Sequence, residues 1–218
     1  MNQIKETKLK TSRLTIIAGI IAPVFFVSLF TIEGLLRDGY SPIGMYISAL
    51  SLGSRGGIQI SNFLVFGILF FLFARTVAIV YKNKGASKAG PIMLTIFALC
   101  LFFSGPFVMD PMFTAPSEIT IHGTIHGILG GFAFLLMPIS CFVFLREFKR
   151  DGTWNSFAPW TLLMAIVISG ALILFMFATK FPVGQNIFRA WFGLIQRMVL
   201  VPYMLWLFTF ALAFYKRL

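Results

Sequence analysis

The stretch that decides the fold is residues 58–80, IQISNFLVFGILFFLFARTVAIV, in which Arg75 is the single charged residue. A helix of about 20 such residues crosses a hydrocarbon layer about 30 Å thick. Inside lipid the stretch has to be helical, because every backbone N–H and C=O group needs a partner within the segment. Arg75 lies near one end, where its long side chain can reach the interface. We therefore predict a transmembrane helix here.

The rest of the chain has the same character. Of its 218 residues, 58% are hydrophobic and 11% are charged, whereas a soluble domain carries about 25% charged residues. We predict an all-α fold, a polytopic membrane protein with a bundle of six transmembrane helices. The expected spans are residues 14–36, 58–80, 88–108, 121–144, 159–179 and 188–215. Residues 14–215 then form one transmembrane domain, with short segments 1–13 and 216–218 on either side.

The basic residues predict the orientation of the bundle. Twelve lie in the two terminal segments and near the connections that follow the second and fourth spans: Lys5, Lys8, Lys10, Arg13, Lys82, Lys84, Lys88, Arg146, Lys149, Arg150, Lys216 and Arg217. Four lie on the other side: Arg37, Arg55, Lys180 and Arg189. Loops rich in Lys and Arg stay in the cytoplasm, so both ends of the chain are expected there (N-in, C-in).

The formal net charge of +11 has the same origin. The basic residues are scattered over several short loops and form no continuous surface, so we expect no nucleic-acid partner. Membrane lipids are the expected partners, and the sequence does not fix the oligomeric state.

The sharpest chemical pattern is HGTIH, which places His122 and His126 four residues apart on one helix. Two imidazoles so placed share a face and can hold one zinc ion, if further ligands are present. Asp110, one short connection away, is the expected third ligand or the carboxylate that orients an imidazole. The alternative is structural: interfacial histidines that hydrogen-bond to Asp110 and close the hairpin between two helices.

Other polar residues lie toward the same outer side. Ionisable side chains within spans are rare and point to function, so Glu33 and Arg197 are candidate ligand-binding residues, with mutual pairing or pairing with Asp110 as the alternative. Tyr40 and Ser48 belong to the long connection 37–57. We expect Tyr40 to contact a ligand and Ser48 to supply a catalytic hydroxyl, with helix capping or solvation in the loop as the alternative for Ser48.

Small residues also recur on the helix that carries the two histidines. Gly123, Gly127, Gly130 and Gly131 follow one another at short intervals. Such spacing favours close packing of one helix against another, and we expect these glycines to serve packing.

Four stretches carry a resemblance to a known family: YSPIGMYISALSLG (40–53), GPFVMDP (105–111), HGTIHG (122–127) and GLIQRMVLVPYMLW (193–206). In order and spacing they resemble the family catalogued as domain of unknown function 998, small membrane proteins of bacteria and archaea. The resemblance implies six helices in a bacterial or archaeal plasma membrane, and outward-facing polar residues. It implies no particular reaction.

A fainter similarity is to the alkaline ceramidase and adiponectin-receptor superfamily, which are seven-helix zinc-dependent membrane hydrolases. Those proteins use a serine, an aspartate and three histidines, whereas this chain has only two histidines. The similarity is an analogy at the level of residue types.

Two functional hypotheses follow. The first is an enzyme in which His122, His126 and Asp110 hold a zinc ion that activates water against a lipid-like substrate. The second is a transporter or a ligand-binding or sensor protein, in which Arg197 holds an anionic group and the His/Asp cluster handles protons.

Overall fold

In the computed structural model, residues 2–217 are described, with side chains from residue 13 onward, and they contain helices and connections but no β-strand. The α-helices are α1 (Asn2–Leu36), α2 (Gly56–Asn83), α3 (Ala89–Phe103), α4 (Ile121–Arg150), α5 (Ala158–Lys180), α6 (Pro182–Phe188) and α7 (Phe192–Tyr215). Short 3-10 helices lie in the connections: η1 (Ile47–Ser51), η2 (Pro116–Glu118), η3 (Gly152–Trp154) and η4 (Arg189–Trp191).

Five helical segments of the described chain are long and apolar enough to cross a membrane: Arg13–Leu36, Gly56–Asn83, Ile121–Arg150, Ala158–Lys180 and Pro182–Tyr215. The protein is therefore a multi-pass membrane protein, as predicted. The apolar helix α3 has 15 residues, which corresponds to about 22 Å and falls short of a hydrocarbon layer of about 30 Å.

The predicted helix over residues 88–108 was too long, since α3 ends at Phe103. Ser104 is the C-cap residue, and its hydroxyl donates to the carbonyl of Cys100 at 2.8 Å. Gly105 and Pro106 follow. Proline has no N–H to give to the helix, and it disfavours helical backbone in the residue before it. The dipeptide therefore ends the helix.

The expected span 188–215 lies within the apolar segment Pro182–Tyr215, which is divided into two helices. The chain forms α6 first and begins α7 only at Phe192. Pro182 opens α6, and Gly184 lies against the backbone of Phe177 so closely that a Cβ would collide with it. This glycine lets α6 fold back on the end of α5.

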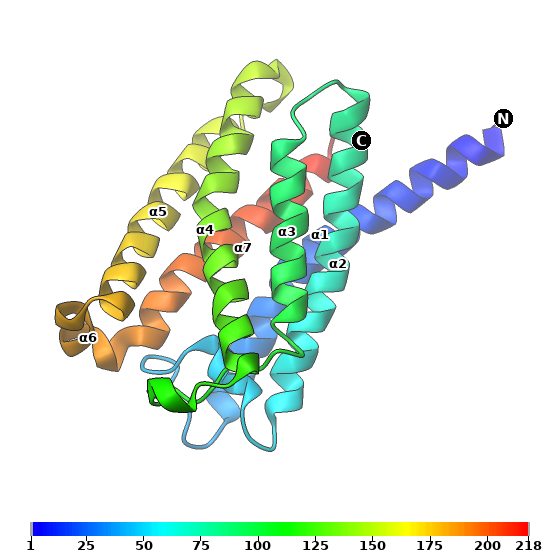
Figure 1. The fold of residues 1–218 in the computed structure, drawn as a ribbon. Coiled ribbons are helices and arrows are strands. Elements are labelled where there is room, and N and C mark those ends of the chain that lie inside the picture. Colours follow the sequence, from blue (N-terminus) through cyan, green and yellow to red (C-terminus); the bar gives the residue numbers. More distant parts are fainter. Residues whose placement is uncertain (1, 218) are drawn as a thin grey trace.

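The connections gather at two ends of the bundle (Figure 1). Both termini, the α2–α3 connection and the α4–α5 connection lie at one end, here called the basic end because Lys84, Arg150 and Arg217 belong to it. The connection 37–55, the connection 104–120 and α6 lie at the opposite end, here called the loop end. All predicted site residues belong to the half of the molecule nearest the loop end.

Aromatic side chains fill the centre of the bundle. Phe66 and Phe70 of α2 meet Phe97 of α3, and Tyr203 and Trp206 of α7 are fully buried. α4 packs against α3 and α5, and α5 packs against α7. α4 meets α7 through large side chains, with Phe144 against Trp206 and Phe210. α4 and α5 lie together at the basic end and diverge toward the loop end (Figure 1).

Candidate functional site

A cavity of about 660 Å³ lies where α4 and α5 diverge. Its apolar wall comes from both helices and includes Phe134, Leu135, Leu172, Phe175 and Met176. Leu135 is 50% exposed and Met176 is 40% exposed. The cavity is therefore open at the flank of the bundle, between the two helices.

Three of the four residues predicted to be catalytic line this cavity. Ser48 reaches it from η1, Asp110 from the connection after α3, and His126 from α4. His126 is 8% exposed. The fourth, His122, is exposed on the surface of α4 and lies against the ring of Phe107, with ring centroids 5.5 Å apart.

One ring nitrogen of His126 has a fixed partner. Its Nδ1 lies 2.7 Å from the carbonyl oxygen of Phe107. A carbonyl oxygen only accepts hydrogen bonds, so Nδ1 carries the proton. In the neutral ring the lone pair is then on Nε2. α4 therefore presents an acceptor nitrogen, and Phe107 of the connection 104–120 holds the ring in place.

Asp110 holds the start of α4. The backbone N–H of Thr120 donates to Oδ2 of Asp110 at 2.9 Å, and the Thr120 hydroxyl donates to Oδ1 at 2.8 Å. The same hydroxyl accepts from the N–H of Gly123 at 3.0 Å, as an N-cap. Asp110 therefore closes the α3–α4 connection through Thr120, and not through a histidine as the structural alternative had it.

The donor set expected for zinc does not assemble. Among the residues whose side chains are described, no three His, Cys, Asp or Glu gather closely enough to hold a metal ion. His122 is exposed, Nδ1 of His126 is bound to Phe107, and both oxygens of Asp110 are bound to Thr120. These residues do not fit a zinc site.

Arg197 and Tyr40 also lie outside the cavity. The guanidinium donates from Nη1 to the carbonyls of Pro42 at 2.6 Å and Met45 at 3.2 Å, and from Nη2 to the Tyr40 hydroxyl at 2.7 Å. Burial raises the pKa of Tyr40, and the nearby Arg197 opposes that shift. Pairing of Arg197 with Glu33 or Asp110 was expected and was wrong: its partners are the connection 37–55.

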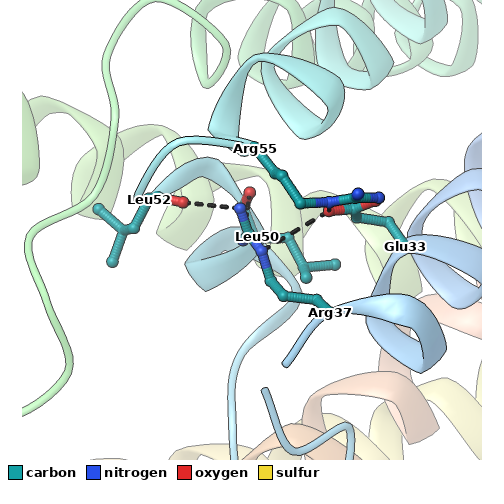
Figure 2. A network of polar contacts seen from close by, with 5 residues as sticks. All are labelled: Glu33, Arg37, Leu50, Leu52 and Arg55. Carbon is teal, nitrogen blue, oxygen red and sulfur yellow. Dashed lines mark hydrogen bonds and ion pairs between the residues drawn. The ribbon is translucent and has the colours of Figure 1, made fainter. Parts of the chain in front are cut away.

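Glu33 belongs to a separate network (Figure 2). Arg55 donates to its two oxygens, from Nε at 2.9 Å and from Nη2 at 2.5 Å. Nε of Arg37 lies 3.6 Å from Oε1, while the two Nη atoms donate to the carbonyls of Leu50 and Leu52 at 2.8 Å each. Glu33 therefore anchors the connection 37–55 and does not face the cavity.

Two cavity residues escaped the sequence analysis. Gln196 is 7% exposed, and its Oε1 accepts from the N–H of Ile47 at 2.7 Å. Tyr46 stacks on Phe192 with ring centroids 5.8 Å apart, and burial raises its pKa to about 12. Gln196 has no charge and Tyr46 is neutral at pH 7, so a search for charged residues and histidines passes over both. A polar amide directly beside Arg197, inside an apolar segment, was the available signal.

The expectation that the glycines of α4 pack against another helix is not met at Gly123, whose close neighbour is Asp110 of the connection 104–120. A Cβ added at Gly127, Gly130 or Gly131 would meet nothing within 4 Å. All three line the cavity. Their missing side chains provide open space beside α4 and do not serve close helix contact.

A smaller internal cavity of about 30 Å³ adjoins the same polar residues, and Ser48, His126 and Gln196 line both cavities. Its volume is sufficient for one water molecule. These three side chains therefore form the polar wall between the large cavity and the core of the bundle.

Another cavity, of about 270 Å³, lies at the basic end. Its charged residues already face one another or the backbone: Lys84 lies 3.6 Å from Asp151, and Arg217 donates to the carbonyl of Thr153 at 3.2 Å. Hydrogen bonds from Thr153 hold the pKa of Asp151 below its usual value. None of the predicted site residues lies there.

Comparison with known proteins gives one match. No curated protein and no solved structure matches the chain, so the fainter similarity to ceramidases and adiponectin receptors receives no support from such a match. A family model matches residues 20–213, which covers nearly the whole helical bundle. The chain belongs to the family described as "Protein of unknown function (DUF998)".

Proposed function

We propose that this membrane protein binds a lipid-like amphiphile in the cavity between α4 and α5. The observation that carries the proposal is the lining of the 660 Å³ cavity, which is apolar along α4 and α5 and polar at Ser48, His126 and Gln196. Ligand sites in proteins typically combine a large apolar wall with a few placed polar groups. An amphiphile likewise has a long apolar part and a small polar part, which match the two parts of this lining.

The length of the cavity suits a hydrocarbon chain. Its lining on α4 runs from Gly123 to Leu135, which corresponds to about 18 Å of helix. Between these residues the three open glycines leave room beside the helix backbone. The opening at the flank would allow a chain to enter from the lipid layer.

The proposed setting is a bundle of six spans with both ends in the cytoplasm. α3 lies beside α2 and α4 and runs between the same two ends of the bundle (Figure 1), which supports counting it as a sixth, shortened span. The basic residues gather at one end, which supports a cytoplasmic location for that end, with residues 1–13 and 216–218. The cavity would then open to the outer leaflet of a bacterial or archaeal plasma membrane.

Zinc-dependent hydrolysis and anion transport by Arg197 receive less support. Hydrolysis through zinc needs a third and fourth ligand, and His122, His126 and Asp110 do not converge. Transport of an anion by Arg197 needs a guanidinium that is available, whereas this one is bound to the connection 37–55. Binding of an amphiphile uses the residues that do line the cavity.

The test fills the cavity at one glycine. Gly130→Leu adds a side chain to open space inside the cavity, and Gly170→Leu adds the same side chain to an exposed position of α5 that does not line it. Both replace a helical glycine, so both are expected to fold. Wild-type protein and the two variants are released from native membranes and compared by native mass spectrometry.

We expect wild-type protein and Gly170→Leu to carry a bound lipid-sized molecule and Gly130→Leu to lose it, with unchanged unfolding midpoints. Equal occupancy in all three proteins would overturn the proposal. A stable dimer that only Gly130→Leu disrupts would also overturn it, because a second copy would then cover the cavity.

A further inference from the structure

We infer that the cavity selects an amphiphile whose polar group is uncharged and both accepts and donates a hydrogen bond, such as a primary carboxamide or a hydroxyl. The inference rests on the proposed function and adds the chemistry of the head group. It comes from Gln196 and His126, because a backbone partner of each side chain fixes which of its atoms donates and which accepts.

Gln196 presents a donor. Its Oε1 accepts from the N–H of Ile47 at 2.7 Å, and a backbone N–H can only donate, so the oxygen is assigned to that side. The Nε2 amide remains for the cavity, which the residue lines. Gln196 is 7% exposed, so a ligand group reaches this amide nitrogen from the cavity.

His126 presents an acceptor. Its Nδ1–H is bound to the carbonyl of Phe107 at 2.7 Å, which leaves the Nε2 lone pair of the neutral ring for the cavities that it lines. A ligand binds more tightly when it completes the hydrogen bonds of polar groups that line its cavity. A ligand that donates to Nε2 and accepts from Gln196 satisfies both groups at once.

The remaining polar groups favour an uncharged ligand. Ser48 and Tyr46 line the cavity with hydroxyl groups, which donate or accept. The charged residues of the lining are Asp110, whose oxygens are bound to Thr120, and Lys180, which is exposed at the end of α5. A carboxylate or an ammonium group beside Gln196 and His126 would be desolvated without an opposite charge in contact, which is costly.

Gln196 and His126 therefore distinguish head groups by their hydrogen-bond pattern. A carboxamide offers a carbonyl to Gln196 and an N–H to His126. A hydroxyl offers a lone pair and an O–H to the same two groups. A simple ester accepts but cannot donate, and a trimethylammonium group does neither.

The experiment compares four probes that each carry a 12-carbon chain and differ in the head group: dodecanamide, methyl dodecanoate, sodium dodecanoate and dodecyltrimethylammonium. Each is titrated below its aggregation concentration into purified protein, and its dissociation constant is derived from the shift in unfolding midpoint. We expect dodecanamide to bind at least about tenfold more tightly than the other three, because each unmade buried hydrogen bond weakens binding by about this factor.

Two variants separate hydrogen bonding from general stability. His126→Asn keeps an amide N–H close to the position of Nδ1, for Phe107, and removes Nε2. Gln196→Glu keeps an acceptor for Ile47 and replaces the donor with an acceptor. We expect each variant to weaken dodecanamide by about tenfold, and Gln196→Glu to gain affinity for dodecyltrimethylammonium, a reversal that mere loosening of the fold would not produce.

The outcomes also separate the inference from the proposed function. Equal affinities for all four probes, abolished by Gly130→Leu, would overturn the inference and leave the amphiphile cavity intact. Tighter binding of dodecanoate than of dodecanamide would overturn it in the same way. If no probe binds, or if Gly130→Leu changes no affinity, both fail.

Discussion

Gly123 allows the carboxylate of Asp110 to reach the first turn of α4. A Cβ at this position would collide with Oδ2 of Asp110, and Thr120 occupies the other side of the carboxylate. A negative charge at a helix N-terminus is stabilised by the unpaired N–H groups of the first turn. The aspartate therefore fixes where α4 begins and, through it, where His126 faces.

Gly123→Ala is therefore expected to destabilise the protein by about 1–3 kcal/mol, since the methyl group displaces a bound carboxylate. Gly127→Ala is the matched control: one turn further on, its methyl group meets open space, and alanine favours the helix by about 1 kcal/mol over glycine. Unfolding midpoints in one detergent give the comparison. Equal midpoints for the two variants would show that Asp110 does not hold the helix.

At the scale of elements, the connection 37–55 is a folded cap over the loop end. Four residues of η1 are buried, namely Ile47, Ala49, Leu50 and Ser51. Gly193, at the start of α7, lies so close to the carbonyls of Pro42 and Met45 that any side chain would collide with them. Arg197 and Gln196, one turn further along α7, bind the same connection, and this places Ser48 beside the cavity.

Arg197→Lys is expected to loosen this cap, because an ammonium group cannot reproduce the planar set of bonds to Pro42, Met45 and Tyr40. The measurement is limited proteolysis of the connection 37–55, and we expect cleavage to become several-fold faster. Arg189→Lys is the matched control, because it makes the same change at an exposed arginine of the loop end, which lies over Phe113. If the two variants are cut at the same rate as wild-type protein, the cap does not depend on Arg197.

For the whole molecule, long apolar segments were sufficient to predict an all-α, multi-pass membrane protein. The clustering of basic residues indicated which connections share an end (Figure 1). Both features follow from whether a residue lies in lipid or in water, and residue type alone indicates this. The end of α3 was missed because Gly105–Pro106 lies inside an apolar run, where the hydropathy signal does not fall.

The site was predicted only in part, for a different physical reason. Ser48, Asp110 and His126 do lie around one cavity, because the polar residues of a membrane protein avoid lipid. Their partners depend on packing between distant segments: Arg197 meets carbonyls that lie about 150 positions away in the chain. Residue type does not encode such partners, and the zinc hypothesis failed at that step.

The proposed topology predicts which ends can be labelled from outside intact cells. Glu118→Cys places a thiol in the exposed connection at the loop end, and Lys149→Cys places one at the exposed basic end. The native cysteines, Cys100 and Cys141, are buried. A maleimide that cannot cross membranes should label only Glu118→Cys in intact cells and both variants after lysis. Labelling of Lys149→Cys in intact cells would reverse the orientation.

The central claim is that an amphiphile occupies the space between α4 and α5, and photolabelling locates it most directly. A dodecanamide carrying a diazirine at mid-chain is irradiated with the protein, and the labelled residues are identified by peptide mass spectrometry. We predict labels on Phe134, Leu172 and Met176, which line the cavity, and their loss in Gly130→Leu. Labels spread over lipid-facing residues such as Ile68 and Leu99, with none between α4 and α5, would contradict the account.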